Sequence, residues 1–162
     1  MFINYIILAH HFPAQLKKLV DRLNDKNVYF FIHIDVTSDI HAFKKLISYS
    51  NVVFLEKREN AIWGNFTIVQ ATLNGMNEVL KYGKGGFTIL LSGQDYPLVS
   101  NQDIERFLST HHNYNFIDIK PALEAWPIEY KAKIHSYYLN LTPKRGNGFF
   151  IPYFLEIPFI SF

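Results

Sequence analysis

The sequence predicts an α/β domain in which a mostly parallel sheet is flanked by helices. Short continuous apolar runs alternate with segments whose apolar residues recur at helical spacing, in the order β-α-β-α-β-α-β-α-β. Apolar strands of this kind are buried on both faces, and strands joined by helices form parallel sheets with right-handed crossovers. The chain has 162 residues, of which 49% are hydrophobic, so it can bury a sizeable core.

The five predicted strands are rich in Ile, Val, Phe and Tyr, side chains that favour strands. They span residues 3–9, 28–34, 52–55, 87–91 and 116–119. The four predicted helices carry apolar stripes from Leu16 to Leu23, Ile40 to Ile47, Val69 to Leu80 and Ile104 to Leu108. We expect the stripes at 16–23 and 69–80 to pack in the core.

Residues that favour helix ends stand at the borders of these stripes. Asp39 and Asn65 occupy positions where a helix cap is expected. Ser100 and Asp103 resemble a capping box with Asp in place of Glu. Glycines at 83, 85 and 86 are expected to end the third helix.

The composition excludes several classes of function. The chain has no cysteine, so it has neither a disulfide framework nor a thiolate metal site. Its net charge is +2 and its Lys and Arg residues are scattered, so we expect no nucleic-acid partner. The N-terminus lacks the features of a secretory signal, and no apolar run approaches the roughly 18 residues of a spanning helix. We therefore expect a cytoplasmic location.

The stretch 149–162 is almost wholly apolar and contains Pro152 and Pro158. Two prolines and a short length argue against a spanning helix. Because exposed apolar segments favour association, we expect this stretch to contact further chain, an oligomer partner or, peripherally, a membrane surface.

Several motifs with known chemistry are absent. No G-x-G-x-x-G loop follows the first strand, and there is no Walker loop, no G-x-S-x-G elbow at Ser92 and no H-E-x-x-H. His33 and Asp35 share one strand face because side chains alternate along a strand. This pair could join a metal site with further ligands, but a core histidine beside a strand-end carboxylate is the simpler interpretation.

Polar residues gather at the predicted carboxyl ends of the strands, where parallel sheets bind their ligands. They are His10 and His11, Asp35, and the segments 58–64 and 92–95. Two of these segments contain longer patterns, W-G-x-x-x-x-V-x-A-x-L from Trp63 and L-L-S-G-x-D-Y-P-L from Leu90. Together with I-L-A-H at the first strand end and I-H-I-D at the second, they resemble the core-2/I-branching N-acetylglucosaminyltransferase and peptide O-xylosyltransferase family. The resemblance covers about residues 1–120.

The resemblance implies a GT-A-like fold and transfer of N-acetylglucosamine or xylose from a UDP-sugar, with inversion at the anomeric carbon. The nucleotide-sugar site that it implies consists of Ala9, His10, Asp35, Arg58, Trp63, Gly64 and Asp95. Ala9 and His10 would lie beside the uracil, and Asp35 would contact the uridine. Asp95 would lie where other GT-A enzymes carry their metal-binding D-x-D.

The resemblance also implies a reaction without a divalent cation or other cofactor. Gly93-Gln94-Asp95 offers one carboxylate, which is a poor Mg²⁺ site by itself. The departing diphosphate would instead be stabilised by basic side chains. Asp95 is the candidate catalytic carboxylate within the chain, whereas we expect the family's catalytic base and basic clamp beyond Phe162.

The expected partners are a UDP-sugar donor and a glycan or glycoconjugate acceptor. Glu124 and Lys131 fall roughly where the family contacts its acceptor. We expect residues 1–120 to form the nucleotide-sugar-binding part and residues 121–162 to begin the acceptor side. Relatives in animals are membrane-anchored in the secretory pathway.

Each candidate residue also has a purely structural interpretation. Asp35 could cap the turn before Thr37, Trp63 could be a core residue, and Asp95 could form an Asx turn. Arg58 could be a surface side chain. Two other functions remain open, a non-catalytic binding or assembly fragment and a metal-dependent hydrolase that uses His10, His33 and Asp35.

Overall fold

The computed structural model describes residues 1–62, 64–82, 85–129, 137–140 and 148–151. The chain divides into two compact units, Met1–Asn113 and Tyr114–Phe162. The first unit contains the central sheet and four helices among its described residues. The functional division that we expect at residue 120 remains a prediction.

The first unit is built on a four-stranded parallel sheet with the order β3-β2-β1-β4. Its strands are β1 (Phe2–Ala9), β2 (Val28–Ile34), β3 (Val52–Phe54) and β4 (Gly86–Ser92). β1 lies between β2 and β4, with Ala9 opposite Ile34 and Leu8 opposite Ser92. The α/β class and the parallel sheet predicted from the sequence are confirmed.

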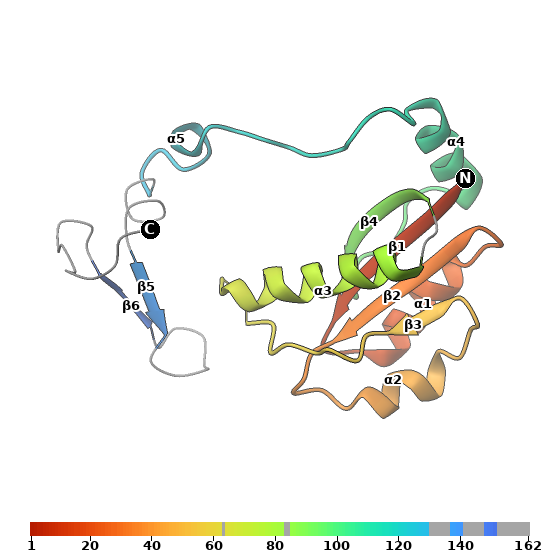
Figure 1. The fold of residues 1–162 in the computed structure, drawn as a ribbon, viewed down its shortest axis with the longest axis horizontal. Helices are drawn as coiled ribbons and strands as arrows, with labels where there is room; N and C mark the ends of the chain where they lie inside the picture. The colour runs from red at the N-terminus through yellow and green to blue at the C-terminus, as the bar shows by residue number, and fades with distance from the viewer. Residues whose placement is uncertain (63, 83–84, 130–136, 141–147, 152–162) are drawn as a thin grey trace. The chain divides into compact units, whose positions relative to one another are not determined.

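Helices cover both faces of this sheet (Figure 1). α1 (Pro13–Leu23) and α2 (Ile40–Leu46) lie on one face, and α3 (Phe66–Tyr82) crosses the other. α4 (Asn101–Thr110) follows β4. The predicted caps are confirmed, since Asp39 accepts the His41 N–H at 2.9 Å and Ser100 Oγ accepts the Asp103 N–H at 3.1 Å.

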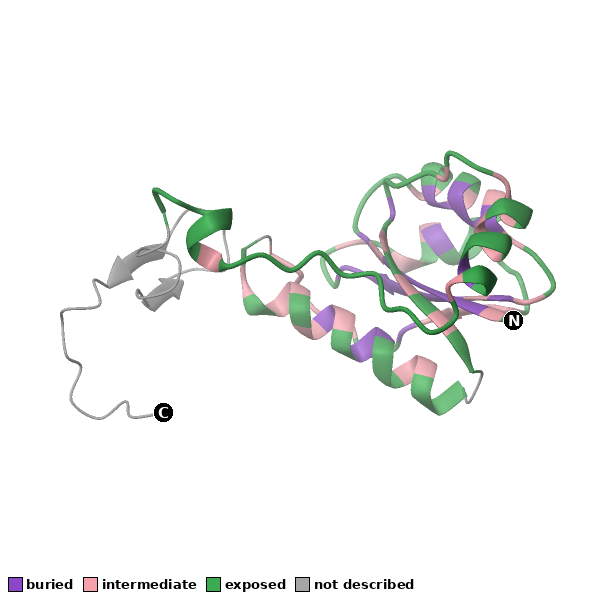
Figure 2. Cartoon of the chain, turned by 90° about the horizontal axis from the view of Figure 1, so that it is seen from above, coloured by how far each residue is buried: buried purple, intermediate pink, exposed green. Residues whose placement is uncertain are grey.

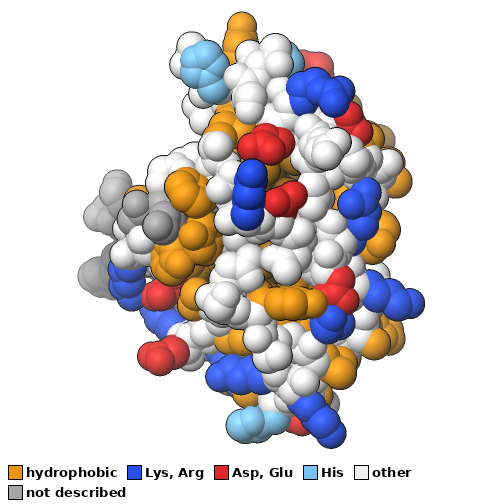
Figure 3. Space-filling view, turned by 90° about the vertical axis from the view of Figure 1, so that its right-hand side faces the viewer, with side chains coloured by type: hydrophobic (Ala, Val, Ile, Leu, Met, Phe, Trp, Pro, Cys, Tyr) orange, Lys and Arg blue, Asp and Glu red, His pale blue; other side chains and the backbone are white. Residues whose placement is uncertain are grey.

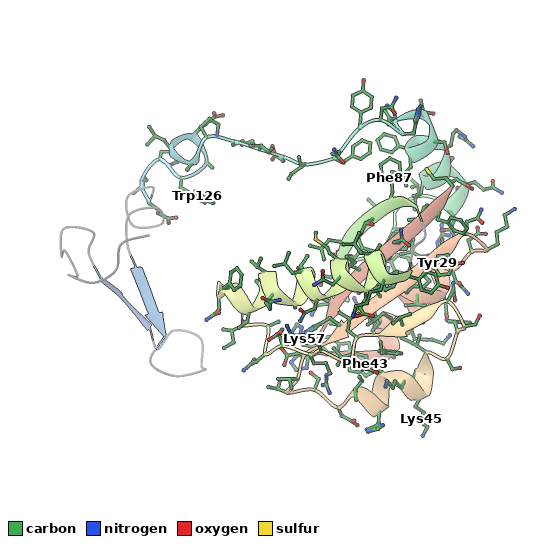
Figure 4. All side chains as sticks on the ribbon, viewed as in Figure 1. Tyr29, Phe43, Lys45, Lys57, Phe87 and Trp126 are labelled. Atoms are coloured by element: carbon green, nitrogen blue, oxygen red, sulfur yellow. The ribbon has the colours of Figure 1, made fainter. Side chains whose placement is uncertain are left out.

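The larger core lies between the sheet and the α1/α2 layer. It is built from alternate strand residues, such as Ile7 and Phe30, that pack against Leu16, Leu19 and the other members of the predicted 16–23 stripe. Phe43 points from α2 toward the same face (Figure 4) and is buried. The expectation that this stripe is core is confirmed.

The smaller core lies between the sheet and α3, and contains Ile6, Phe31 and Leu55. α3 approaches the sheet through a small residue, because a Cβ added at Gly75 would lie 2.6 Å from Ile6 Cγ2. Ala71 and Asn74 are the other buried residues of this helix.

The expectation that the α3 stripe from Val69 to Leu80 is core is wrong. Val69, Leu73, Met76 and Leu80 are all exposed, and Figure 2 shows exposed residues recurring along this helix. Helical spacing reveals that a helix has an apolar side, but it does not reveal which side meets the sheet. Here the small residues around Gly75 face the sheet, since they allow the closest approach.

The predicted fifth strand at 116–119 is also wrong. This segment has no regular secondary structure, and Phe116, Ile117 and Ile119 are exposed. An apolar run becomes a strand only where a neighbouring strand completes its backbone hydrogen bonds, and composition does not report that neighbour.

The described part of the second unit contains α5 (Ala122–Ala125) and an antiparallel pair, β5 (Tyr137–Asn140) and β6 (Gly148–Ile151). Most of the apolar stretch 149–162 lies outside the described residues. In the part of the chain that the structure describes, no helix has the length and apolarity required to cross a bilayer.

Candidate functional site

The carboxyl ends of the central strands lie at one edge of the sheet. The Asp35 N–H donates to the Ala9 carbonyl at 2.9 Å, and the Gly93 N–H donates to the Leu8 carbonyl at 2.8 Å. These bonds hold the first residue after β2 and the first residue after β4 against the end of β1. Figure 4 marks the two edges, with Tyr29 at the start of β2 and Lys57 beyond the end of β3.

The strand order creates a topological switch point at this edge. The chain runs from β1 through β2 to β3, and then returns to place β4 on the other side of β1. α1, which follows β1, and α4, which follows β4, pack on the same face of the sheet, whereas α3 packs on the other face. Ligands of open α/β sheets bind in the crevice that such a reversal opens.

Asp35 lies at the end of β2 and is 6% exposed. Its Oδ1 accepts the N–H of Thr37 at 2.9 Å and the hydroxyl of Thr37 at 2.6 Å, and its Oδ2 accepts the Ala61 N–H at 2.7 Å. Burial acts to raise the pKa of Asp35, but the hydrogen bonds from Thr37 and Ala61 outweigh it and hold the pKa below its ordinary value. The carboxylate thus caps its own turn and also fixes the loop after β3.

Arg58 binds the same turn from the other side. Its Nε donates to the Ile34 carbonyl at 2.8 Å, and its Nη2 donates to the carbonyls of Asp35 and Ser38, each at 2.6 Å. The side chain is partly buried, so the interpretation of Arg58 as a mere surface residue is wrong. Its guanidinium holds the backbone that carries Asp35.

His33 ties this loop to the sheet. Its Nε2 accepts the Glu59 N–H at 2.8 Å, so the neutral ring carries its proton on Nδ1. Asn74 of α3 donates to Glu59 Oε1 at 2.9 Å. Burial lowers the pKa of His33, although the charges of Asp35 and Glu59 act to raise it.

These contacts argue against metal binding by His33 and Asp35 as a pair. The lone pair of His33 Nε2 is used by a backbone N–H, and both oxygens of Asp35 accept hydrogen bonds. Within the described residues, no group of three or more His, Asp and Glu side chains is placed to hold a metal ion.

Asp95 lies across the β1 end from Asp35, in the turn after β4. Its Oδ2 accepts the Ser92 N–H at 2.8 Å, and its own N–H donates to the Ser92 carbonyl at 3.1 Å. The carboxylate thus accepts from an N–H three residues before it, whereas an Asx turn accepts from an N–H two residues after it, which Pro97 lacks, so the Asx-turn interpretation is wrong. Asp95 is nevertheless exposed, so its carboxylate remains accessible.

Gly93 brings this turn against the end of β1. A Cβ at Gly93 would lie 2.7 Å from the Ala9 Cβ, which is closer than carbon atoms approach. Gln15 of α1 donates to the Gln94 carbonyl at 3.1 Å and supports the turn from the helix. The close approach therefore depends on glycine at this position.

Of the remaining candidate residues, the structure describes four and leaves two outside its described residues. Ala9 is buried at the end of β1, whereas His10 is exposed beside it, and its carbonyl accepts the Ser38 hydroxyl at 2.6 Å. Gly64 has a φ of 79°, a left-handed conformation that favours glycine. Glu124 is exposed in α5 of the second unit. Trp63 and Lys131 lie outside the described residues.

Sequence reasoning gave no role of their own to several residues that build this edge. They are Thr37, Glu59, Ala61, Asn74, Gln15 and, as a packing position, Gly93. Thr37 had a visible signal, because an Asp followed two residues later by Thr is a common local hydrogen-bonding pattern. The partners from distant segments had none, since their contacts depend on the tertiary fold.

The described face in Figure 3 carries Lys and Arg side chains interspersed with Asp and Glu. At the opposite, amino edge of the sheet there is an open hollow of about 540 Å³, whose lining includes Tyr29, Tyr49 and Tyr82. The polar groups of Asp35 and Asp95 are not part of that hollow. The carboxyl edge is distinguished by its switch point and its convergent polar side chains rather than by a deep cavity.

A parallel α/β domain with polar groups at the carboxyl ends around a switch point has the architecture of a nucleotide-binding enzyme domain. The family model of the Core-2/I-Branching enzyme matches residues 3–149. The chain belongs to this family.

Curated relatives agree with the family match. Human Xylosyltransferase 2 is 30% identical over 122 residues, which is 71% of this chain and 14% of that protein. Xylosyltransferase from Ciona intestinalis is 28% identical over 118 residues, 70% of this chain and 14% of that protein. Human Xylosyltransferase 1 is 29% identical over 121 residues. The chain thus spans about one seventh of the length of the curated relatives it matches.

Proposed function

We propose that Met1–Asn113 is the donor-nucleotide-binding unit of an inverting glycosyltransferase. The donor is a UDP-sugar, with N-acetylglucosamine or xylose as the sugar, and the acceptor is a hydroxyl of a glycan or protein. Family membership and the relatives called xylosyltransferases support this reaction class. The observation that carries the proposal is the β1/β4 switch point, with Ala9 and His10 between Asp35 and Asp95.

The hydrogen bonds of Asp35 leave its carboxylate able to accept one further hydrogen bond. A carboxylate offers about four acceptor positions, and three are used by Thr37 and Ala61. In our proposal the remaining position accepts the N3–H of uracil. The exposed ring of His10, which lies 4.4 Å from that of His11 between ring centres, is available to stack beside the base.

The reaction requires a base and a means of stabilising the leaving group. The acceptor oxygen forms a bond to the anomeric carbon as the bond from that carbon to the diphosphate oxygen breaks. The hydroxyl proton passes to a carboxylate, and UDP leaves with the bonding electrons. Asp95, as the exposed carboxylate at the switch point, is proposed to face the sugar of the donor. Acceptor contacts are proposed for Glu124 and Lys131.

Two parts of the catalytic apparatus have no assigned residue in the described chain. Arg58 is engaged by three carbonyls, so it is not proposed as the diphosphate clamp. The catalytic base is likewise unassigned. We propose that the leaving diphosphate is stabilised by basic side chains and that binding requires no divalent cation.

Calorimetric titration with UDP tests the nucleotide site. We expect binding that is the same in EDTA and in Mg²⁺, and that weakens at least about tenfold in Asp35→Asn, as loss of a buried charged hydrogen bond predicts. Asp39→Asn is the matched control, because Asp39 only caps α2 and Asn caps equally well. Folding of each variant is checked by circular dichroism. Absence of UDP binding by the folded wild-type chain, with and without cation, contradicts the proposal.

A further inference from the structure

A series of hydrogen bonds connects His33 to the carboxylate of Asp35 through the loop that leads from β3 to α3 (Figure 1). His33 is 1% exposed, and its Nε2 accepts the Glu59 N–H at 2.8 Å. Two residues further along the same loop, the Ala61 N–H donates to Asp35 Oδ2 at 2.7 Å. His33 and Asp35 therefore hold one short loop segment at two points.

Glu59 is also held by two other parts of the fold. Its carbonyl accepts the Val36 N–H at 3.1 Å, and its Oε1 accepts from Asn74 Nδ2 of α3 at 2.9 Å. Asn74 is buried, so the second contact is shielded from solvent. Glu59 thus joins the end of β2, the turn after it and α3, and a displacement of Glu59 is passed to Ala61 two residues away.

The ring of His33 can change its hydrogen bonding at this point because it titrates. A neutral ring accepts the Glu59 N–H, whereas a protonated ring carries an N–H on both nitrogens and accepts nothing. Two donors would then face each other, and this hydrogen bond would be lost. Nδ1 is buried and has no hydrogen-bond partner among the described residues, so the Nε2 bond alone orients the ring.

The surroundings of His33 keep its ring neutral at pH 7. The neighbouring elements bring uncharged side chains, with Leu8 of β1 opposite His33 and Asn74 on α3. Burial lowers the pKa of His33 more than the nearby carboxylates raise it, so the pKa lies below its ordinary value. The charged groups that act on the ring are Asp35 at the end of its own strand, and Glu59 and Arg58 in the loop after β3.

We propose that His33 is a positioning residue of the nucleotide site, and that its protonation releases Asp35 from the orientation that accepts the uridine. We call the contacts among His33, Glu59, Ala61 and Asp35 the loop latch. The proposal rests on the nucleotide site proposed above, because His33 acts through Asp35 rather than on the nucleotide. It predicts that donor affinity decreases as pH falls.

An NMR titration of the ligand-free chain between about pH 8 and pH 5 tests the loop latch without a nucleotide. The ring signals of His33 and the amide signal of Ala61 are expected to shift with one midpoint. The Ala61 shift is expected to disappear in His33→Gln, which keeps an acceptor but does not titrate. His41→Gln removes an exposed histidine of α2 and is the matched control, which retains the shift.

The titration of the wild-type chain needs no variant, so it decides the matter even where His33→Gln fails to fold. An Ala61 amide that does not follow His33 in the wild-type chain overturns the proposal. An Ala61 shift that persists in folded His33→Gln overturns it as well.

Calorimetric titration with UDP at several pH values tests the consequence for binding. Between about pH 7.5 and pH 5, the affinity of the wild-type chain is expected to fall at least about threefold more than that of His33→Gln, since one proton changes an affinity by at most about tenfold per pH unit. Protonation of UDP or of exposed His10 affects both proteins alike, so the difference reports His33.

The calorimetric outcomes separate this proposal from the nucleotide site on which it rests. UDP binding with parallel pH curves for the two proteins overturns the role of His33 and leaves the nucleotide site intact. Absence of UDP binding by the folded wild-type chain at every pH overturns both.

Discussion

Asp35 and Arg58 stabilise the same turn by opposite means. The carboxylate of Asp35 accepts N–H and hydroxyl donors, and the guanidinium of Arg58 donates to carbonyls of the same segment. The side chain of each residue thus satisfies backbone groups that leave the sheet and have no strand partner. Two of the seven residues that the family resemblance assigns to the nucleotide-sugar site, Asp35 and Arg58, therefore also shape this edge.

Replacing Arg58 tests this role at the scale of one residue. Arg58→Lys keeps the charge but loses the planar fork that reaches three carbonyls, and we expect a loss of about 2–3 kcal/mol in the free energy of unfolding. Arg22→Lys is the control, because half-buried Arg22 donates to one carbonyl among the described residues, that of Val99 at 2.9 Å. Urea denaturation measures both, and equal effects would contradict the assigned role.

His33 makes stability depend on pH in a defined direction. Its pKa in the folded chain lies below the ordinary value of 6.5, so the unfolded chain takes up the proton first as pH falls. The stability contributed by the neutral ring is complete above about pH 6.5 and decreases below it, by at most about 1.4 kcal/mol for each pH unit.

The pH dependence of the free energy of unfolding is measured by urea denaturation between about pH 5 and pH 8. His33→Gln, which keeps an acceptor for the Glu59 N–H, is expected to flatten the slope in this range. His41→Gln removes an exposed histidine of α2 and should leave the slope unchanged. A steep slope that survives in His33→Gln would assign the effect to another group.

At the scale of elements, the sequence predicted the central strands closely. The predicted run 28–34 coincides with β2, and those at 3–9 and 87–91 lie within β1 and β4. These strands are recognisable because their apolar runs are continuous, as is typical of strands buried on both faces. β1 and β2 are buried in this way, whereas every second residue of β4 is exposed. The segment 116–119 shows the same composition without forming a strand, because pairing with a neighbour decides the outcome.

The close approach of the turn after β4 to β1 depends on Gly93. A substitution that adds one methyl group at this position tests it. Gly93→Ala places a Cβ 2.7 Å from that of Ala9, and we expect a loss of about 1–3 kcal/mol and a displaced Asp95 turn. Gly85→Ala is the control, since a Cβ there meets nothing within 4 Å. Ala9→Gly in the same chain is expected to restore part of the stability measured by thermal unfolding. Failure of this rescue would locate the strain elsewhere.

At the scale of the molecule, the chain consists of two compact units, and the first contains the sheet, both cores and the candidate edge. We expect residues 1–113 alone to unfold in one cooperative urea transition and to bind UDP with the affinity of the whole chain. The comparison uses calorimetry on both proteins. A fragment that folds cooperatively but fails to bind UDP would show that the nucleotide site needs the second unit.

The sequence by itself determined the α/β class, the parallel strands, the helix caps and the candidate residues at the strand ends. These features follow from local rules, namely hydrophobic periodicity, capping chemistry and the direction of parallel strands. Only the tertiary structure decided that Arg58 binds carbonyls, that Glu59 links His33 to Asn74 and that α3 turns its apolar stripe outward. These features join segments that are distant in the chain, and their energy depends on geometry that no local pattern encodes.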